Sequence, residues 1–135
     1  MECLWDSDAR VRMRAADVME KISREQAPLL QRYKPALLGL LAEATQQELR
    51  WHLALAVPRL RLNPAECRRA AEILRGYLED RGSIVKTLAM QGLADLVRQA
   101  PALREEVLDL IRALTRSGTP AMRARGRLLI QRFGD

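Results

Sequence analysis

The fold of this chain is indicated by a stretch that recurs along it, first as LWDSDARVRMRAADVMEKI at residues 4–22. Each copy has an aliphatic residue followed by a basic one, a small or apolar residue three to four positions later, and large apolar residues over two further turns. The pairs are Val11-Arg12, Leu49-Arg50, Val85-Lys86 and Met122-Arg123. Their basic members are separated by 38, 36 and 37 residues. A constant period in this range is typical of stacked helical repeats.

The segments between these copies also predict helices, over residues 35–44, 64–80 and 101–116. Each begins with proline, which suits the first turn of a helix because the N–H that proline lacks would be unpaired there. Each also carries apolar residues at helical spacing, such as Leu103, Val107 and Leu110. Paired with the recurring helix that follows, they give three helical hairpins preceded by one unpaired helix. Ala15, Ala89 and Gly126 hold equivalent small positions and predict close helix packing.

The composition indicates one all-α domain over residues 1–135, with units of about 1–34, 35–63, 64–100 and 101–135. The chain has 135 residues, 48% of them hydrophobic but only 4% aromatic, and a formal net charge of +6. Cys3 and Cys67 are too few for a disulfide framework and have no metal-ligand spacing, so both are expected to be buried thiols. No apolar run is long enough for a membrane span. We therefore expect a cytoplasmic protein that does not bind membranes.

The sequence offers little for catalysis. His52 is the single histidine, so neither a catalytic triad nor a multi-histidine metal site can be built, and we expect it on the surface. No glycine-rich phosphate loop or nucleophile elbow is present. The expectation is a protein that is not an enzyme and needs no cofactor or metal.

At this point the chain resembles the HEAT-repeat family. The first unit, from Leu4 through Arg12 to Met19, is similar to the turn and second helix of such a repeat. The resemblance implies a right-handed α-α superhelix, an α-solenoid of about seven helices, with related armadillo-like arrays as an alternative. Such arrays serve mainly as scaffolds for binding.

The resemblance also implies a ladder of charged hydrogen bonds between neighbouring repeats, made by an acid in the turn and a basic residue six positions later. The acid is present before Arg12 and Lys86 and absent before Arg50 and Arg123. The residues expected in this ladder are Asp6, Arg12, Arg50, Asp80, Lys86 and Arg123.

In resembling proteins the second helix of each pair lines the concave surface. Helical phase puts Met13 on the solvent side of the first recurring helix, and Trp51, Leu55 and Leu62 on that side of the second. An apolar stripe where polar residues are expected marks an interaction site, and Trp51 suits its centre. We expect a partner protein to bind these four residues. The alternative is that neighbouring helices bury this central helix on both sides.

Arg123, Arg125 and Arg127 follow one another on the last helix, with no acid before Asp135. They are candidates for binding an anion or a nucleic acid, which gives the second functional hypothesis; HEAT-like DNA glycosylases show that the architecture can do this. A solubilising end of the array is the alternative. Measuring affinity at different salt concentrations distinguishes nucleic-acid binding from protein binding, because phosphate-driven binding weakens steeply as salt rises.

Two further expectations concern partners. The unpaired first helix leaves an apolar edge, where a second copy or preceding repeats would dock. Some HEAT-like bacterial proteins act as lyases or chaperones toward tetrapyrrole-carrying proteins, a third role that the resemblance implies and no residue specifically supports.

Overall fold

The protein is all-α: the computed structural model describes residues 1–134, and no strand occurs within them. Helices connected by short loops or 3₁₀ turns make up the described chain. The α-helices are α1 (Ala9–Gln26), α2 (Lys34–Glu43), α3 (Gln47–Ala56), α4 (Pro64–Tyr77), α5 (Ser83–Leu96), α6 (Arg104–Ser117) and α7 (Pro120–Gly134). The 3₁₀ helices are η1 (Glu2–Trp5), η2 (Ala27–Tyr33), η3 (Val57–Arg59) and η4 (Pro101–Leu103).

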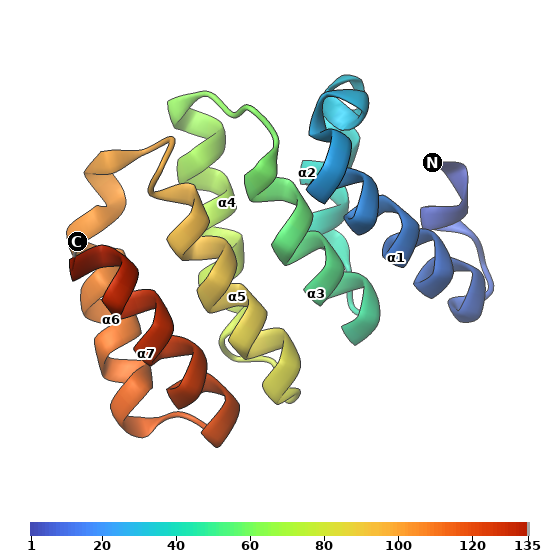
Figure 1. Ribbon diagram of the computed structural model, residues 1–135. Coiled ribbons are helices and arrows are strands. Elements are labelled where there is room, and N and C mark those ends of the chain that lie inside the picture. The colour runs from blue at the N-terminus through green and yellow to red at the C-terminus, as the bar shows by residue number, and fades with distance from the viewer. Residues whose placement is uncertain (135) are drawn as a thin grey trace.

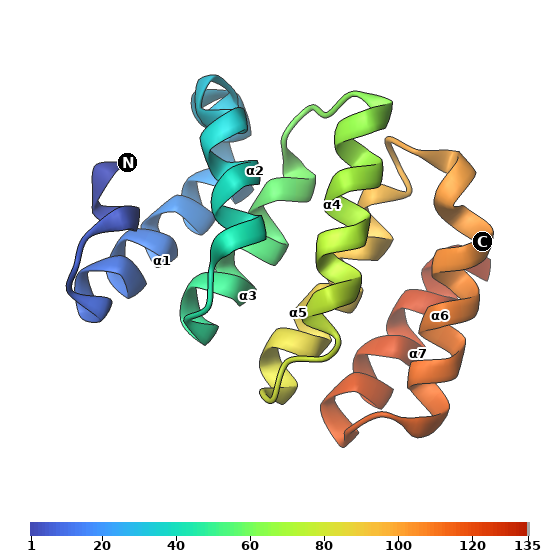
Figure 2. The ribbon, with the colours of Figure 1, turned by 180° about the vertical axis from the view of Figure 1, so that it is seen from behind.

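The helices form two layers. Helices α1, α3, α5 and α7 contact one another in that order and lie side by side in Figure 1. Helices α2, α4 and α6 form the second layer, which faces the viewer in Figure 2. Contacts between α4 and α5, and between α6 and α7, join the layers. The first layer therefore has one side covered by the second layer and one side open to solvent.

Local sequence explains where several helices begin. Asp8 caps α1 by accepting a hydrogen bond from the N–H of Arg10 at 2.9 Å. Asn63 and Glu66 form a capping box at the start of α4, in which each side chain accepts from the other residue's N–H at 2.8 Å. The helix expected to begin at Pro101 starts instead as the 3₁₀ turn η4, and α6 begins at Arg104.

Helix α3 ends earlier than the helical phase of the sequence suggests. It stops at Ala56, and the chain continues as η3, which contains Pro58. Proline has no N–H to donate to a carbonyl one turn earlier, and its ring clashes with that carbonyl. The phase argument therefore fails beyond this point: Pro58 is buried, and Leu62 lies in the loop before α4 rather than on a helix face.

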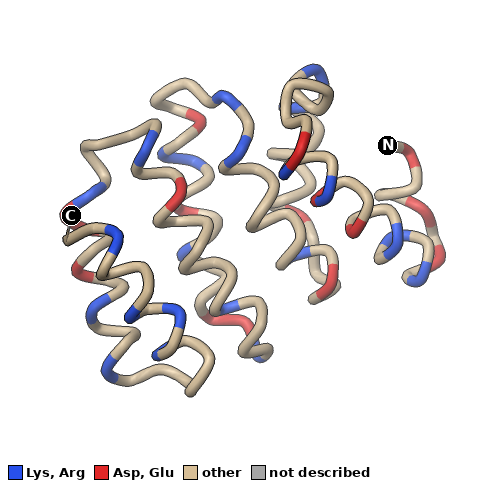
Figure 3. Tube along the Cα trace, in the orientation of Figure 1, with Lys and Arg blue, Asp and Glu red and all other residues tan. Residues whose placement is uncertain are grey.

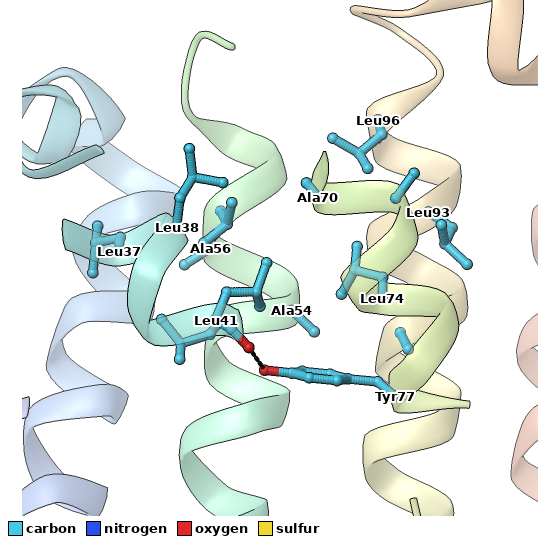
Figure 4. Close-up of a cluster of buried hydrophobic side chains, with 14 of the residues drawn as sticks. Leu37, Leu38, Leu41, Ala54, Ala56, Ala70, Leu74, Tyr77, Leu93 and Leu96 are labelled. Atoms are coloured by element: carbon cyan, nitrogen blue, oxygen red, sulfur yellow. Dashed lines mark hydrogen bonds between the residues drawn. The ribbon is translucent and has the colours of Figure 1, made fainter. Parts of the chain in front are cut away.

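One hydrophobic cluster runs through the molecule from Leu4 to Leu129. It is built mainly from leucine and alanine at the contact of the two layers. Figure 4 shows the part between α2, α3, α4 and α5, where the buried Tyr77 hydroxyl donates a hydrogen bond to the carbonyl of Leu41. This bond satisfies a carbonyl in the last turn of α2, which has no partner within the helix.

Small residues bring helices close together, as the sequence predicts for Gly126. A Cβ added at Gly126 would overlap the Thr115 hydroxyl of α6. A Cβ at Gly92 would lie 2.5 Å from the backbone carbonyl oxygen of Ala54 in α3. Backbone of α3 thus approaches α5 at a distance that only glycine permits.

Polar side chains link successive helices of the first layer near their N-terminal ends. Arg12 of α1 donates through Nε to Gln46 Oε1 at 2.9 Å, ahead of α3. Arg50 of α3 donates through Nη1 to Asp80 Oδ2 at 2.8 Å, ahead of α5. The hydroxyl of Ser83, the first residue of α5, lies 2.6 Å from that of Thr119, in the turn before α7. Each link joins one helix to the turn before the next.

The six residues expected in the ladder take different places in these links. Asp80 bonds Arg50 of the preceding unit, and the carbonyl of Asp6, not its carboxylate, accepts from Arg12 Nη1 at 2.6 Å. The side chains of Lys86 and Arg123 make no hydrogen bond or ion pair with residues 1–134. Arg12 and Arg50 thus form hydrogen bonds with the turn before the next helix of the first layer, whereas Lys86 and Arg123 do not.

Candidate binding site

A depression lies on the open side of the first layer. It has a volume of about 360 Å³, and we call it the Leu55 depression. Its lining comes from α1, α3, η3, α5 and α7 and consists of Glu20, Arg24, Leu55, Arg59, Leu88, Gln91, Asp95 and Arg125. Two leucines thus share one concave surface with three arginines and two acids. This mixture suits a ligand that is partly apolar and partly acidic.

Glu20 is the best-anchored charge of this surface, with only 5% of the residue exposed. Its carboxylate accepts a hydrogen bond from Arg59 Nη1 at 2.5 Å and two from Arg24, at 2.9 and 3.1 Å. Arg59 Nη1 also donates to the Ser23 hydroxyl oxygen at 2.8 Å. Glu20 therefore fixes the guanidinium of Arg59, which lies in η3, 39 residues further along the chain.

The pKa of Glu20 reflects these contacts. Burial opposes ionisation of the carboxyl group, but the hydrogen bonds and charges of Arg59 and Arg24 outweigh it and hold the pKa below its ordinary value. Glu20 is thus ionised at neutral pH. A buried carboxylate with two arginine partners is satisfied, so it serves to position the arginines rather than to act as a proton donor.

A second depression of about 590 Å³ adjoins the first, with Arg24, Arg59 and Asp95 lining both. Five arginines and one acid line it; we call it the arginine pocket and define it by Arg24, Arg59, Arg61, Arg98, Arg132 and Asp95. These residues come from the C-terminal ends of α1, α5 and α7 and from the segments that follow α3 and α5. Arg132 Nη2 lies 3.6 Å from Asp95 Oδ1.

The four residues expected to bind a partner protein do not all meet at one place. Leu55 lines the depression named after it. Trp51 lies one turn earlier on α3, partly buried, with its ring stacked on that of His52 at 3.6 Å between centroids. Met13 is exposed on α1, the neighbour of α3. Leu62 lies apart in the loop before α4, where its N–H donates to Gln99 Oε1 at 2.8 Å.

The three arginines expected to bind an anion also separate. Arg125 is partly buried, lines the Leu55 depression and donates to Gln91 Oε1 at 2.8 Å. Arg123 and Arg127 are exposed on the same helix and line neither depression. Figure 3 shows basic residues and no acidic ones along the described part of α7.

His52 and Cys3 differ from the sequence expectation. His52 is buried, not on the surface, because α3 packs against both α1 and α5. Its Nδ1 lies against the carbonyl oxygen of Glu48, so this nitrogen carries a hydrogen. Cys3 is exposed, whereas Cys67 is buried as expected. Within residues 1–134, no group of three or more His, Cys, Asp and Glu side chains is placed to hold a metal ion.

The N-terminal edge is apolar, as expected for a first helix without a hairpin partner. A depression of about 460 Å³ is lined there by Leu4, Val11, Ala15, Val18, Met19 and Ile22, among others. Val18 at this edge is 55% exposed. No helix of the described chain combines the length and the apolar character needed to cross a membrane.

The arginine pocket was not predicted as a site. Arg24, Arg61 and Arg98 follow one another at intervals of 37 residues, which is close to the spacing of the recurring helix pattern. That regularity is a signal that could have placed them at equivalent ends of successive units. No such regularity identifies Arg59, whose position depends on the early end of α3 and on its bonds to Glu20.

In comparisons with known proteins, no family model, no curated protein and no solved structure matches the chain.

Proposed function

We propose that this domain is a non-enzymatic binding module, a HEAT-like α-solenoid that takes an acidic segment of a partner protein in the Leu55 depression. The solenoid interpretation is supported by the alternation of the two helix layers and by the link from each helix of the first layer to the turn before the next. The open side of that layer is the side on which HEAT-like proteins bind their partners.

The observation that carries the proposal is the lining of the Leu55 depression. Leu55 and Leu88 give an apolar floor for a hydrophobic side chain, and Arg24, Arg59 and Arg125 stand around it. All three guanidinium groups are positioned by hydrogen bonds, Arg24 and Arg59 by Glu20 and Arg125 by Gln91. A positioned arginine loses little side-chain entropy when it pairs with a carboxylate of a partner.

The acids within the depression favour a protein over a nucleic acid. Glu20 and Asp95 line it together with the arginines. A phosphate backbone would meet both carboxylates, whereas an amphipathic acidic segment can turn apolar side chains toward the leucines. Nucleic-acid binding is therefore an outcome that the test must distinguish.

The test is a peptide-display selection on the whole chain, followed by affinity measurements at low and high salt. We expect enriched peptides that combine acids with at least one large apolar residue. Leu55→Asp should abolish their binding, because a carboxylate would then occupy the apolar floor. Leu128→Asp is the control: Leu128 is 61% exposed on α7 and does not line the depression.

Two results would contradict the proposal. One is selected peptides that bind the Leu55→Asp variant as well as the unchanged protein. The other is that only nucleic acids bind, with an affinity that falls steeply as salt rises.

A further inference from the structure

The arginine pocket holds more positive charge than its own acids compensate. Its five guanidinium groups are matched by Asp95 in the pocket and by Glu20 beside it. Glu20 bonds Arg24 and Arg59, and Asp95 lies near Arg132. Five positive and two negative charges leave an excess of three. Like charges gathered in one concavity raise its potential and attract a compensating anion.

Helix capping does not account for these arginines. Cations at helix C-termini are often held by the free carbonyls of the last turn. Here Gln99 Nε2 donates to the carbonyls of Pro58 and Leu60, at 3.0 and 2.8 Å, and so occupies the carbonyls after α3. The side chains of Arg61 and Arg98 make no hydrogen bond or ion pair with residues 1–134. Their donors are available to a ligand.

Some of the donors of Arg59 are also available to a ligand. All the hydrogen bonds that its side chain makes with the described residues, to Glu20 and Ser23, use Nη1. Its Nε and Nη2 make no bond with the described residues. The bonds through Nη1 fix the plane of the guanidinium group, so its remaining donors are presented without further loss of side-chain freedom.

We propose that the arginine pocket binds a phosphate monoester group. A phosphate monoester carries nearly two negative charges at neutral pH and three terminal oxygens, so it can accept from several guanidinium groups at once. A carboxylate brings one charge and would leave most of the excess uncompensated. The site goes beyond the proposed peptide binding: it shares Arg24 and Arg59 with the Leu55 depression, but its ligand needs neither Leu55 nor Leu88.

A phosphodiester backbone fits the charge distribution less well. The excess is concentrated in one pocket, and the adjoining Leu55 depression holds two leucines and two acids. A nucleic-acid strand needs cations spread along its path. A phosphate monoester carries its charge on one group, so the arginine pocket alone can bind it.

The experiment is calorimetric titration of the whole chain with inorganic phosphate, with a phosphoserine peptide, and with the same peptide unphosphorylated. Arg61→Gln/Arg98→Gln is the test variant. Arg123→Gln/Arg127→Gln is the matched control, since it removes the same charge from exposed positions outside the pocket. We expect saturable binding that the test variant weakens at least about tenfold, and the control by much less, because a hydrogen bond to a charged group contributes that much.

Comparing the three titrations identifies the kind of molecule that carries the phosphate group. Binding of the phosphopeptide that exceeds that of inorganic phosphate, with no binding of the unphosphorylated peptide, supports a phosphorylated protein. Equal binding of both phosphate ligands supports a free phosphate compound. Leu55→Ala, which removes part of the apolar floor without adding a charge beside Arg24 and Arg59, should leave either result unchanged, which separates this site from the proposed function.

Three results would overturn the proposal. They are no saturable binding of either phosphate ligand, equal weakening by the two arginine pairs, and binding of duplex DNA that is tighter than that of both phosphate ligands and is lost in Arg61→Gln/Arg98→Gln.

Discussion

Glu20→Gln tests whether a buried carboxylate holds the lining of the Leu55 depression together. Glutamine keeps the volume of the side chain but removes the charge that pairs with Arg59 and Arg24. Breaking a fully buried ion pair costs about 3–5 kcal/mol. Here Arg59 keeps its bond to the Ser23 hydroxyl, and its side chain is 25% exposed, so water recovers part of the loss. We expect a loss of about 2 kcal/mol.

Urea unfolding followed by circular dichroism measures this loss directly. For a chain of this size a loss of about 2 kcal/mol lowers the melting temperature by about 6–8 °C. The control is Asp109→Asn, which removes the exposed partner of Arg112, 3.6 Å away. It should change stability by less than about 0.5 kcal/mol. If the two variants unfold alike, Glu20 does not anchor the surface and the reasoning is wrong.

The same variant has a defined dependence on pH. The pKa of Glu20 is lower in the folded protein than in the unfolded chain, so the unfolded chain takes up the proton first as pH falls. The stability contributed by the Glu20 carboxylate is therefore fully present above about pH 4.3, the ordinary glutamate pKa, and is lost as pH falls through the folded value. The difference between the unchanged protein and Glu20→Gln should shrink over that range. A constant difference would contradict the assigned role.

The remaining predictions concern packing and buried polar groups, and all are measured by urea unfolding. Gly92→Ala should cost about 1–3 kcal/mol, because its Cβ would lie 2.5 Å from a backbone carbonyl of α3 that cannot move cheaply. Gly39→Ala, where no atom lies within 4 Å of the added Cβ, should instead stabilise the protein by about 0.5–1 kcal/mol; equal effects would refute the close approach at Gly92. Tyr77→Phe should cost about 1–2 kcal/mol, since it leaves a carbonyl at the end of α2 without its donor, and a neutral result would show that water replaces the hydroxyl. Thr87→Val should be neutral or stabilising by up to about 1 kcal/mol, because the Thr87 hydroxyl is buried without a partner among the described residues; a clear loss would reveal one.

Sequence reasoning was sufficient for features that depend on residues close together in the chain. The all-helical composition, the helix start at Pro64 and the close approach at Gly126 follow from propensity, capping and periodicity, which are local properties. The phase argument held along α3 only to Ala56, because it assumed an unbroken helix across Pro58. Leu62 therefore lies in a loop and not on the helix face where it was expected.

The sequence by itself thus determined which segments are helical and how often the pattern repeats, because a side chain and its own backbone specify helix formation. Only the tertiary structure decided that Glu20 is buried rather than exposed, since burial depends on Arg59 approaching from a distant segment. It also decided that Arg61 and Arg98 face one pocket, since each is an ordinary exposed arginine within its own unit. These arginines share one pocket because packing brings the ends of separate helices together, and no local sequence pattern encodes the distance between those ends.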